Sequence, residues 1–546
     1  MSSAADYEVV DSEKPITLAN VRPFEDFVRM GRYCYLILIF SEFLLLSGAG
    51  NMVYMVYAGA APRSVSCVGS NFTIEDVCKQ GLNHRELTDC ELKIDYEFKS
   101  INVEFEYVCK ETALVKSSIS VQMTGVLVGT LLFGSLSDRF GRLKILMFSF
   151  SMTSFVSIFC SFSTSLTMFT VLRTILGFFT GGVIGTYGVY KMEQIPKKHR
   201  FWVATVIAWA PNFIFINAIA FLANDWRTFQ QIIFAISCPA FVLYFYVYES
   251  PRWLIQRGRI SEAREVMQNI QRIDRANDLK KEEMEKMLDV EYQKHLAKEG
   301  KMKNYTIRHL FYTPSMALAT VVLCSGVFFT SMINYGLVFN MESLAGSLFL
   351  NSVIMGLLRW FINIITGVLD YKYKVVGRKL VHFVSQATIA FSLGSIATIY
   401  YFDIHEEYKG FIRWSTIIAT ATTSQIFISK TILAMEFYPT VVRNSALAFK
   451  STCSRVGTIC APQLFILAAS TLTIPYTILF LMATADTIFF QITLPETKGR
   501  ALPENLPPKR RKKSGLDEEE KMIPAPKNSL MYPLTTTKSE ETDSKL

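Results

Sequence analysis

Residues 315–339 read SMALATVVLCSGVFFTSMINYGLVF, a stretch without a charged side chain. A helix of about 20 apolar residues crosses the ~30 Å hydrocarbon core of a bilayer. Comparable stretches recur along the 546-residue chain, in which 50% of residues are hydrophobic and 19% are charged. Soluble chains average about 25% charged residues. The composition therefore predicts a membrane protein and excludes a water-soluble enzyme.

Twelve spans are expected. They should be helices, because lipid offers no hydrogen-bond partner to the backbone, and the every-second-residue alternation of a porin barrel is missing. The spans cover 34–58, 118–137, 144–163, 166–190, 202–223, 228–248, 315–339, 345–369, 380–401, 411–435, 445–469 and 474–494.

Basic residues follow the even-numbered spans, as in Arg139, Arg142 and Lys144 after the second, whereas acidic residues follow the ninth. The positive-inside bias then makes both termini cytosolic. We expect the protein to lie in the plasma membrane. These loops also account for the net charge of +9. No basic and aromatic stripe suggests a nucleic-acid partner.

Residues 59–116 form a large extracellular loop in this topology. It contains four cysteines and the glycosylation sequon at Asn71. An even cysteine count in an exported loop favours two disulfides, with three possible pairings, over free thiols. The cysteines are Cys67, Cys78, Cys90 and Cys109.

Loop motifs repeat at nearly one offset. Glu-x-x-Pro-x-x-x-Arg begins at Glu193 and again at Glu436, where 436 − 193 = 243. Gly-Arg at 141 returns at 377, an offset of 236, and the acidic residue that ends span 6, Glu249, returns as Glu496, an offset of 247. These matches predict two six-helix halves, the architecture of carriers that move two bundles about a central site.

Several motifs carry a family resemblance. They are GSLSDRFGR at 134–142, DWR at 225–227, ESPRWL at 249–254, EFYPTVVRN at 436–444 and LPETKG at 494–499. With them the chain resembles the major facilitator superfamily and, within it, the organic cation/anion/carnitine transporter family of solute carriers. The second copy of the first motif is degenerate, because Lys374 and Val375 precede Gly377.

The resemblance implies that the charged loop residues control gating. Asp138, Arg139, Arg142, Glu193 and Arg200, with Glu436 and Arg443 in the second half, are expected to form ion pairs that hold the two bundles together on the cytosolic side. The alternative is that the arginines only reflect the positive-inside bias, but the acidic residues Asp138 and Glu193 argue against it.

Charges deep inside spans are the candidates for substrate binding, because they are costly there and usually face a cavity. Arg455 lies 12 residues beyond Arg443, ~18 Å into its span. Arg359 lies 11 residues before Asp370, ~16 Å deep. Further candidates are Arg173, Glu42, Asp486, Tyr335, Phe328 and Trp209.

Two midplane arginines favour carboxylates, which guanidinium binds in a bidentate manner. The resemblance adds that anion and carnitine carriers have arginine where Arg455 stands, whereas cation carriers tend to have aspartate. A structural salt bridge from Arg455 to Glu42 or Asp486 is the alternative.

The expected domains are a cytosolic segment 1–33, a bundle 34–248, a cytosolic loop 249–312, a bundle 313–495 and a disordered tail 496–546. Lys509–Lys513 could bind anionic lipid, and Ser544-Lys545-Leu546 fits a PDZ ligand, a peroxisomal address or chance. Neither a catalytic constellation nor a metal or cofactor motif is found.

We therefore expect an alternating-access carrier of small organic ions that favours anionic or zwitterionic, carnitine-like solutes. An organic cation carrier that uses Glu42 or Asp486 is one alternative. A receptor of the same fold that binds solute without moving it is another.

Overall fold

The computed structural model describes residues 24–67, 92–107, 111–200, 203, 209–275, 281–298, 307–373, 375–467 and 471–499. Within these ranges nine helices are long and apolar enough to span a membrane. They are α1 (Arg32–Ala58), α4 (Thr112–Phe140), α5 (Arg142–Cys160), α6 (Leu166–Glu193), α13 (Pro314–Phe339), α14 (Leu348–Lys372), α15 (Arg378–Tyr401), α16 (Lys409–Phe437) and α18 (Thr473–Thr493).

Three further helices lie at the three remaining expected spans. These are α8 (Trp209–Ala223), α9 (Trp226–Tyr244) and α17 (Thr440–Leu467). Each of the three is shorter or more polar than a typical span. The described part of α8 begins only at Trp209, α9 carries Arg227, Gln230 and Gln231 in its first turns, and α17 carries Lys450 and Arg455.

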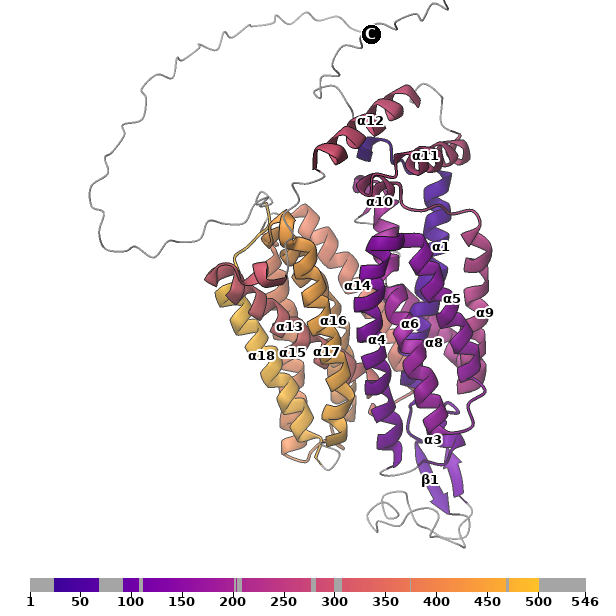
Figure 1. Ribbon diagram of the computed structural model, residues 1–546. Coiled ribbons are helices and arrows are strands. Elements are labelled where there is room, and N and C mark those ends of the chain that lie inside the picture. Colours follow the sequence, from indigo (N-terminus) through magenta and orange to yellow (C-terminus); the bar gives the residue numbers. More distant parts are fainter. Residues whose placement is uncertain are drawn as a thin grey trace, which may run out of the picture. The chain divides into compact units, whose positions relative to one another are not determined.

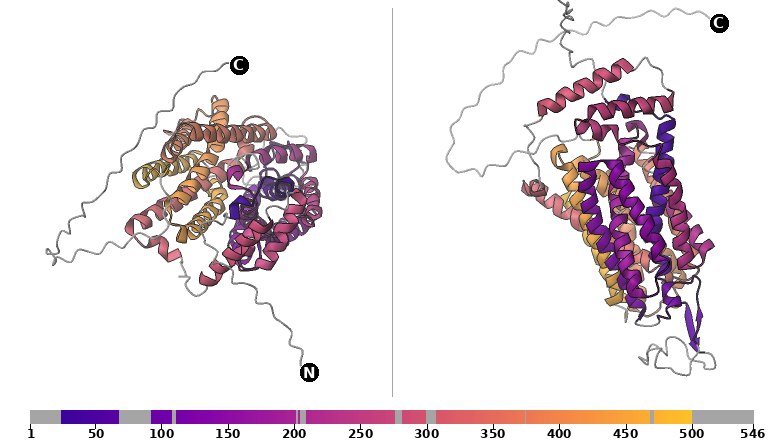
Figure 2. Two further views of the ribbon diagram at one scale, coloured as in Figure 1. Left: turned by 90° about the horizontal axis from the view of Figure 1, so that it is seen from above. Right: turned by 45° about the vertical axis from the view of Figure 1, so that its right-hand side comes forward.

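The helices form two groups (Figures 1 and 2). Helices α1, α4, α5, α6, α8 and α9 pack on one another, and we call them the N-terminal bundle. Helices α13 to α18 form the C-terminal bundle, where α13 packs on α17 and α15 packs on α16 and α18. The bundles meet through α4 with α17 and through α8 with α14.

Short helices cover one end of the N-terminal bundle, which we call the linker end (Figure 1). They are α10 (Pro251–Gln256), α11 (Ile260–Asp274) and α12 (Lys281–Lys298), and Tyr33 N of α1 donates to Asp274 Oδ1 at 2.8 Å. The short 3-10 segments are η2 (Phe24–Asp26), η5 (Lys197–His199), η7 (Ile307–Phe311) and η8 (Met341–Ser343).

At the opposite end, the hairpin end, β1 (Ser64–Cys67) pairs antiparallel with β2 (Leu92–Asp95), and α3 (Ile101–Glu104) follows. Asn71, Cys78, Cys90 and Cys109 lie outside the described residues, as do Lys509–Lys513 and the last three residues. For Cys67 only the backbone is described. The glycosylation and disulfide predictions therefore stay predictions.

Glycines allow α4 and α6 to approach closely. Gly125 and Gly129 on α4, and Gly177 and Gly181 on α6, are each four residues apart, so each pair lies on one helix face. A Cβ atom at any of these four positions would overlap the backbone of the facing helix. This is the small-x-x-x-small packing that lets membrane helices come together without a hydrophobic driving force.

The two halves repeat each other in their bonds as well as in sequence. Glu249 caps the N-terminus of α5, where Leu143 N donates to its Oε1 at 2.9 Å. Glu496 does the same for α15, where Arg378 N and Lys379 N donate at 3.1 and 3.0 Å. Burial alone would raise the pKa of Glu496, but these N–H groups and those of Thr497 and Lys498 hold it below its usual range.

Candidate functional site

The expected gating residues form ion pairs at the linker end. In the N-terminal bundle, Arg142 bonds to Asp138 on α4, and its Nε lies 3.5 Å from Glu193 Oε1 on α6. Arg200 Nε donates to Ile195 O at 3.0 Å, and Arg139 lies over the ring of Phe140.

The C-terminal bundle has the matching network. Arg378 NH1 lies 2.6 Å from Asp370 Oδ1, and its NH2 lies 3.1 Å from Glu436 Oε1. Arg443 Nε donates to Tyr438 O, five residues earlier, at 3.2 Å. Arg200 in the first half makes the equivalent bond to Ile195 O, also five residues earlier. Asp370 thus supplies the acidic partner that the degenerate second loop motif lacks.

These resolved ion pairs each join residues of one bundle. In this conformation, these ion pairs therefore do not form the expected lock between the bundles. A lock in another conformation stays a prediction.

Arg173 is a structural residue of the N-terminal bundle. Its buried guanidinium donates to Gln122 Oε1 at 3.1 Å, Gln230 Oε1 at 3.2 Å and Asn51 O at 2.7 Å. It also lies 4.4 Å above the ring of Tyr54. All these partners belong to the same bundle, so Arg173 has a structural role in this conformation, and the expectation that it faces substrate stays a prediction.

Asp486 is likewise paired within its bundle. Its Oδ2 lies 2.6 Å from Lys430 Nζ, and Lys430 also donates to Thr330 Oγ1 at 3.1 Å. His382 Nε2 lies 3.4 Å from the same carboxylate oxygen. Four helices of the C-terminal bundle contribute to this buried cluster, so Asp486 is a counter-ion there in this conformation, and its assignment to the substrate site stays a prediction.

Glu42 on α1 lies beside α8. Its Oε1 accepts a hydrogen bond from Asn212 Nδ2 at 2.8 Å, and its Oε2 is buried without a hydrogen-bond partner in the described chain. Lys191 is close enough for the two charges to interact. Trp209, at the start of α8, is hydrogen-bonded to Tyr187.

Arg359 lies where α14 meets α8. Its NH2 donates to Asn334 Oδ1 on α13 and to Thr420 O on α16, both at 2.8 Å. Its guanidinium lies 5.2 Å from the ring centroid of Phe213 in the N-terminal bundle. The residue is only 6% exposed, yet its Nε has no acceptor and no carboxylate of the described residues pairs with it.

Arg455 lies on the face of α17 that points to the N-terminal bundle. Ile459 O accepts from Ser120 Oγ of α4 at 2.8 Å, and Gln463 Nε2 donates to the same hydroxyl at 3.1 Å. Residues 455, 459 and 463 are four apart and share one face of the helix. Arg455 is therefore one turn nearer to the linker end than this contact.

The guanidinium of Arg455 is half-buried and, in the described part of the chain, has neither a hydrogen bond nor an ion pair. The alternative of a structural bridge to Glu42 or Asp486 is not found among the described residues, where Glu42 Oε1 accepts from Asn212 and Asp486 pairs with Lys430. The interface between the bundles thus carries two arginines without a carboxylate partner.

The predicted aromatic residues differ in their surroundings. Tyr335 stacks on Phe339 at 5.8 Å and lies near Arg359. Phe328 packs on Phe329 at 5.9 Å, and its carbonyl faces Gly457 of α17. Tyr335 therefore borders the arginine site, whereas Phe328 belongs to the packing of α13 on α17.

The comparisons with known proteins agree with this geometry. The model of the sugar (and other) transporter family matches residues 75–505. The chain belongs to this family. It is a membrane transporter of that type.

Similar proteins of known sequence are members of solute carrier family 22, as the motifs indicated. Member 21 from mouse is 28% identical over 428 residues, which cover 76% of this transporter and 72% of the relative. Human organic anion transporter 3 is 27% identical over 417 residues, covering 74% and 73%.

Solved structures of similar fold are xylose carriers. The crystal structure of the D-xylose–proton symporter matches with a TM-score of 0.58 at 16% identity, covering 86% of this chain and all 100% of that one. The inward-open xylose transporter of E. coli matches with 0.59 at 17% identity, covering 86% and 98%. These matches confirm the major facilitator fold.

Three residues on the helices around the two arginines were not predicted from the sequence. Asn334 was not predicted as a site residue, but it accepts a hydrogen bond from Arg359 and so orients it. Phe213 gives no signal in an apolar stretch. Lys450 could have been found, because it is a charge well inside the span of α17, where its Nζ now bonds to Thr431 Oγ1 at 2.5 Å.

Proposed function

We propose that this transporter moves small organic anions, or zwitterions with a carboxylate, across the plasma membrane by alternating access. The substrate carboxylate would lie between Arg359 and Arg455. The observation that supports this most is the pair of arginines at the bundle interface without a carboxylate among the described residues.

The two arginines leave the charge at the bundle interface unbalanced among the described residues. A buried charge without a partner costs several kcal/mol in order of magnitude, and charged side chains within spans are normally paired or face a water-filled path. A substrate carboxylate would accept charge-assisted hydrogen bonds from the free N–H groups of both guanidinium groups. Tyr335 beside Arg359 and Phe213 beneath it would add flat surfaces for an organic group.

The proposed orientation places the hairpin end outside the cell and both termini in the cytosol, following the charge bias of the loops. Among the described residues, the hydrogen bonds and ion pairs between the bundles lie at the hairpin end, as expected for a site closed to the outside and open to the cytosol. The similarity to a xylose transporter described as inward-open is in keeping with this state.

Glu42 supports the zwitterionic form of the proposal. One of its carboxylate oxygens is buried without a hydrogen-bond partner, and its neighbour Asn212 adjoins Phe213, on which Arg359 lies. A cationic group of the substrate could approach this wall. A purely cationic substrate is the second candidate, and human organic anion transporter 3, whose name indicates anions, favours the first by similarity.

Several further features remain part of the proposal. Disulfides and glycosylation of the 59–116 loop would stabilise it outside the cell. The basic stretch near residue 510 would bind anionic lipid, and the C-terminus would bind a PDZ-domain protein.

A competition panel tests the substrate class. Cells that express the transporter take up a labelled aromatic carboxylate in the presence of unlabelled competitors of equal size. The expected order of inhibition is the carboxylate first, then a zwitterion, with the matching amide and quaternary ammonium ion weakest. Stronger inhibition by the ammonium ion would support a cation carrier, and binding without uptake would support a receptor.

A further inference from the structure

The hairpin end holds a polar bridge that the substrate site does not require. Glu97, just after β2, reaches the N-terminus of α14 in the other bundle, where its Oε2 accepts from Leu348 N at 2.9 Å and its Oε1 from Ser347 Oγ. Arg63, just before β1, places its NH2 2.7 Å from Glu97 Oε2 and 3.3 Å from Gly346 O.

Glu97 therefore acts as a helix cap supplied from the opposite bundle. The N-terminus of a helix presents free N–H groups and a partial positive charge, and a carboxylate there is stabilising. Ser347 already caps α14 from within, since it accepts from Leu350 N at 3.5 Å. The cap from Glu97 can exist only while the two bundles touch at this end.

A second bridge lies on α4. Lys116 Nζ is 2.9 Å from Glu342 Oε1 and donates to Asn340 Oδ1 at 3.0 Å, both in the segment between α13 and α14. The side chains of Lys116 and Glu342 are 21% and 11% exposed, so solvent screens this pair only in part.

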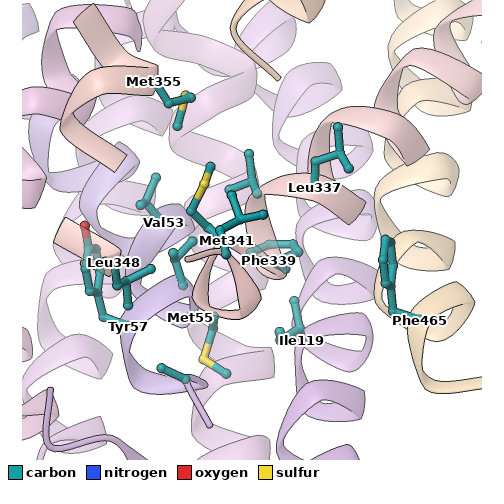
Figure 3. Packing of buried hydrophobic residues seen from close by; sticks show 14 of the residues in the cluster. Val53, Met55, Tyr57, Ile119, Leu337, Phe339, Met341, Leu348, Met355 and Phe465 are labelled. Atoms are coloured by element: carbon teal, nitrogen blue, oxygen red, sulfur yellow. The ribbon is translucent and has the colours of Figure 1, made fainter. Parts of the chain in front are cut away.

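An apolar contact lies beneath these bridges. The ring of Phe349, on the first turn of α14, lies 5.4 Å from Tyr57, 5.4 Å from Phe221 and 6.3 Å from Phe98, all of the N-terminal bundle. Figure 3 shows the surrounding cluster, in which Val53 and Tyr57 of α1 lie near Leu348 and Met355 of α14. This contact is non-directional, whereas the bridges fix one position of α14.

We propose that Glu97 and Lys116 form an interbundle bridge that holds the hairpin end closed and thereby sets the balance between the inward- and outward-facing states. The inference rests on the proposed alternating access. Bonds that exist in only one state stabilise that state by their full free energy. The hairpin is thus a positioning element for transport, although it touches no substrate.

The test uses a cysteine reporter and needs no substrate. Ser120 is 7% exposed between α4 and α17, so Ser120→Cys reports opening of the hairpin end. Its labelling rate by a membrane-impermeant maleimide, corrected for the parent protein, is compared after Glu97→Gln and Lys116→Glu. Glu407→Gln is the matched control, because Glu407 is an exposed carboxylate between α15 and α16.

We expect Glu97→Gln to label about tenfold faster than the control, the factor that corresponds to ~1.4 kcal/mol. Lys116→Glu should also label faster, and Lys116→Glu with Glu342→Lys should return toward the original rate. If Glu97→Gln fails to reach the membrane, the comparison of Lys116→Glu with the double variant Lys116→Glu, Glu342→Lys tests the proposal by itself. Equal rates in Glu97→Gln, Lys116→Glu and Glu407→Gln would overturn the proposal.

Failure of the bridge and failure of the proposed function are distinguishable here. If only a membrane-permeant maleimide labels Ser120→Cys, the proposed orientation is wrong, yet the ratio of rates between variants still tests the bridge. The labelling experiment contains no organic anion, so it does not depend on the substrate class.

Discussion

Arg455 and Arg359 differ from Arg173 and Lys430 in that, among the described residues, each guanidinium keeps N–H groups without an acceptor. Arg173 is complete with three protein acceptors, and Lys430 is complete with Asp486 and Thr330. Arginine thus has a structural role on α6, whereas on α14 and α17 it lies at the contact with the other bundle. The direction of the side chain, rather than its depth, separates the two roles.

Arg455→Asp should abolish carboxylate uptake, because it replaces an attractive charge at the bundle interface by a repulsive one. Arg455→Lys should retain part of the uptake, since lysine keeps the charge but not the bidentate geometry. The loss for Arg455→Asp should be tenfold or more, from ~1.5–3 kcal/mol for a charged hydrogen bond. Uptake of a labelled carboxylate at equal surface expression measures this.

Arg272→Gln is the control for that prediction. Arg272 lies on α11 and is exposed, with a hydrogen bond only to nearby Asn269 in the described contacts, so its loss changes net charge without touching the interface. Undiminished uptake by a folded Arg455→Asp protein would show that the charge interpretation is wrong.

Lys430→Met alone should destabilise the protein by ~3–5 kcal/mol, the usual cost of leaving one member of a buried pair uncompensated. The double change Lys430→Met with Asp486→Leu should recover most of the stability. Thermal unfolding in detergent measures both. A stable double variant that had lost uptake would instead indicate that Asp486 meets the substrate.

Sequence reasoning identified the charged residues but could not assign their partners. A charge within a span is equally costly whether it faces a neighbour or a ligand. Which one it faces depends on the rotation of the helix, and the partner comes from a distant part of the chain. Asp486 lies 56 positions from Lys430, and Arg173 lies 122 from Asn51.

At the scale of elements, hydropathy placed the helices well because bilayer thickness fixes their length. Helix ends were less predictable, since helices continue into the polar zone: α17 begins at Thr440 rather than near 445, and α4 begins at Thr112 rather than near 118. The second loop motif also looked incomplete in the sequence, because it lacks an aspartate just before Gly377. In the structure Asp370, inside α14, takes the place of that aspartate as the partner of Arg378.

The close approach of α4 and α6 should depend on Gly129. A Cβ atom there would overlap the backbone at Phe178, so Gly129→Ala should destabilise by ~1–3 kcal/mol through overpacking. Gly134→Ala is the matched control on the same helix, because a Cβ atom at that position meets nothing within 4 Å. Equal melting temperatures of the two variants would contradict this packing.

At the scale of the whole molecule, the repeated loop motifs predicted two halves, and the paired caps of Glu249 and Glu496 show the repeat in three dimensions. The conformation was not predictable, because one sequence encodes every state of a carrier. The gating arginines are therefore found within their own bundles here, although an interbundle role was expected for them.

We propose above that Arg359 and Arg455, which have no carboxylate partner among the described residues, bind a carboxylate that the transporter carries across the membrane. Purified protein in liposomes tests it with a labelled aromatic carboxylate, its uncharged amide and an aromatic quaternary ammonium ion of the same size. We predict saturable exchange of the carboxylate that is lost in Arg455→Asp. Exchange of the ammonium ion in preference to the carboxylate, unaffected by Arg455→Asp, would contradict the account.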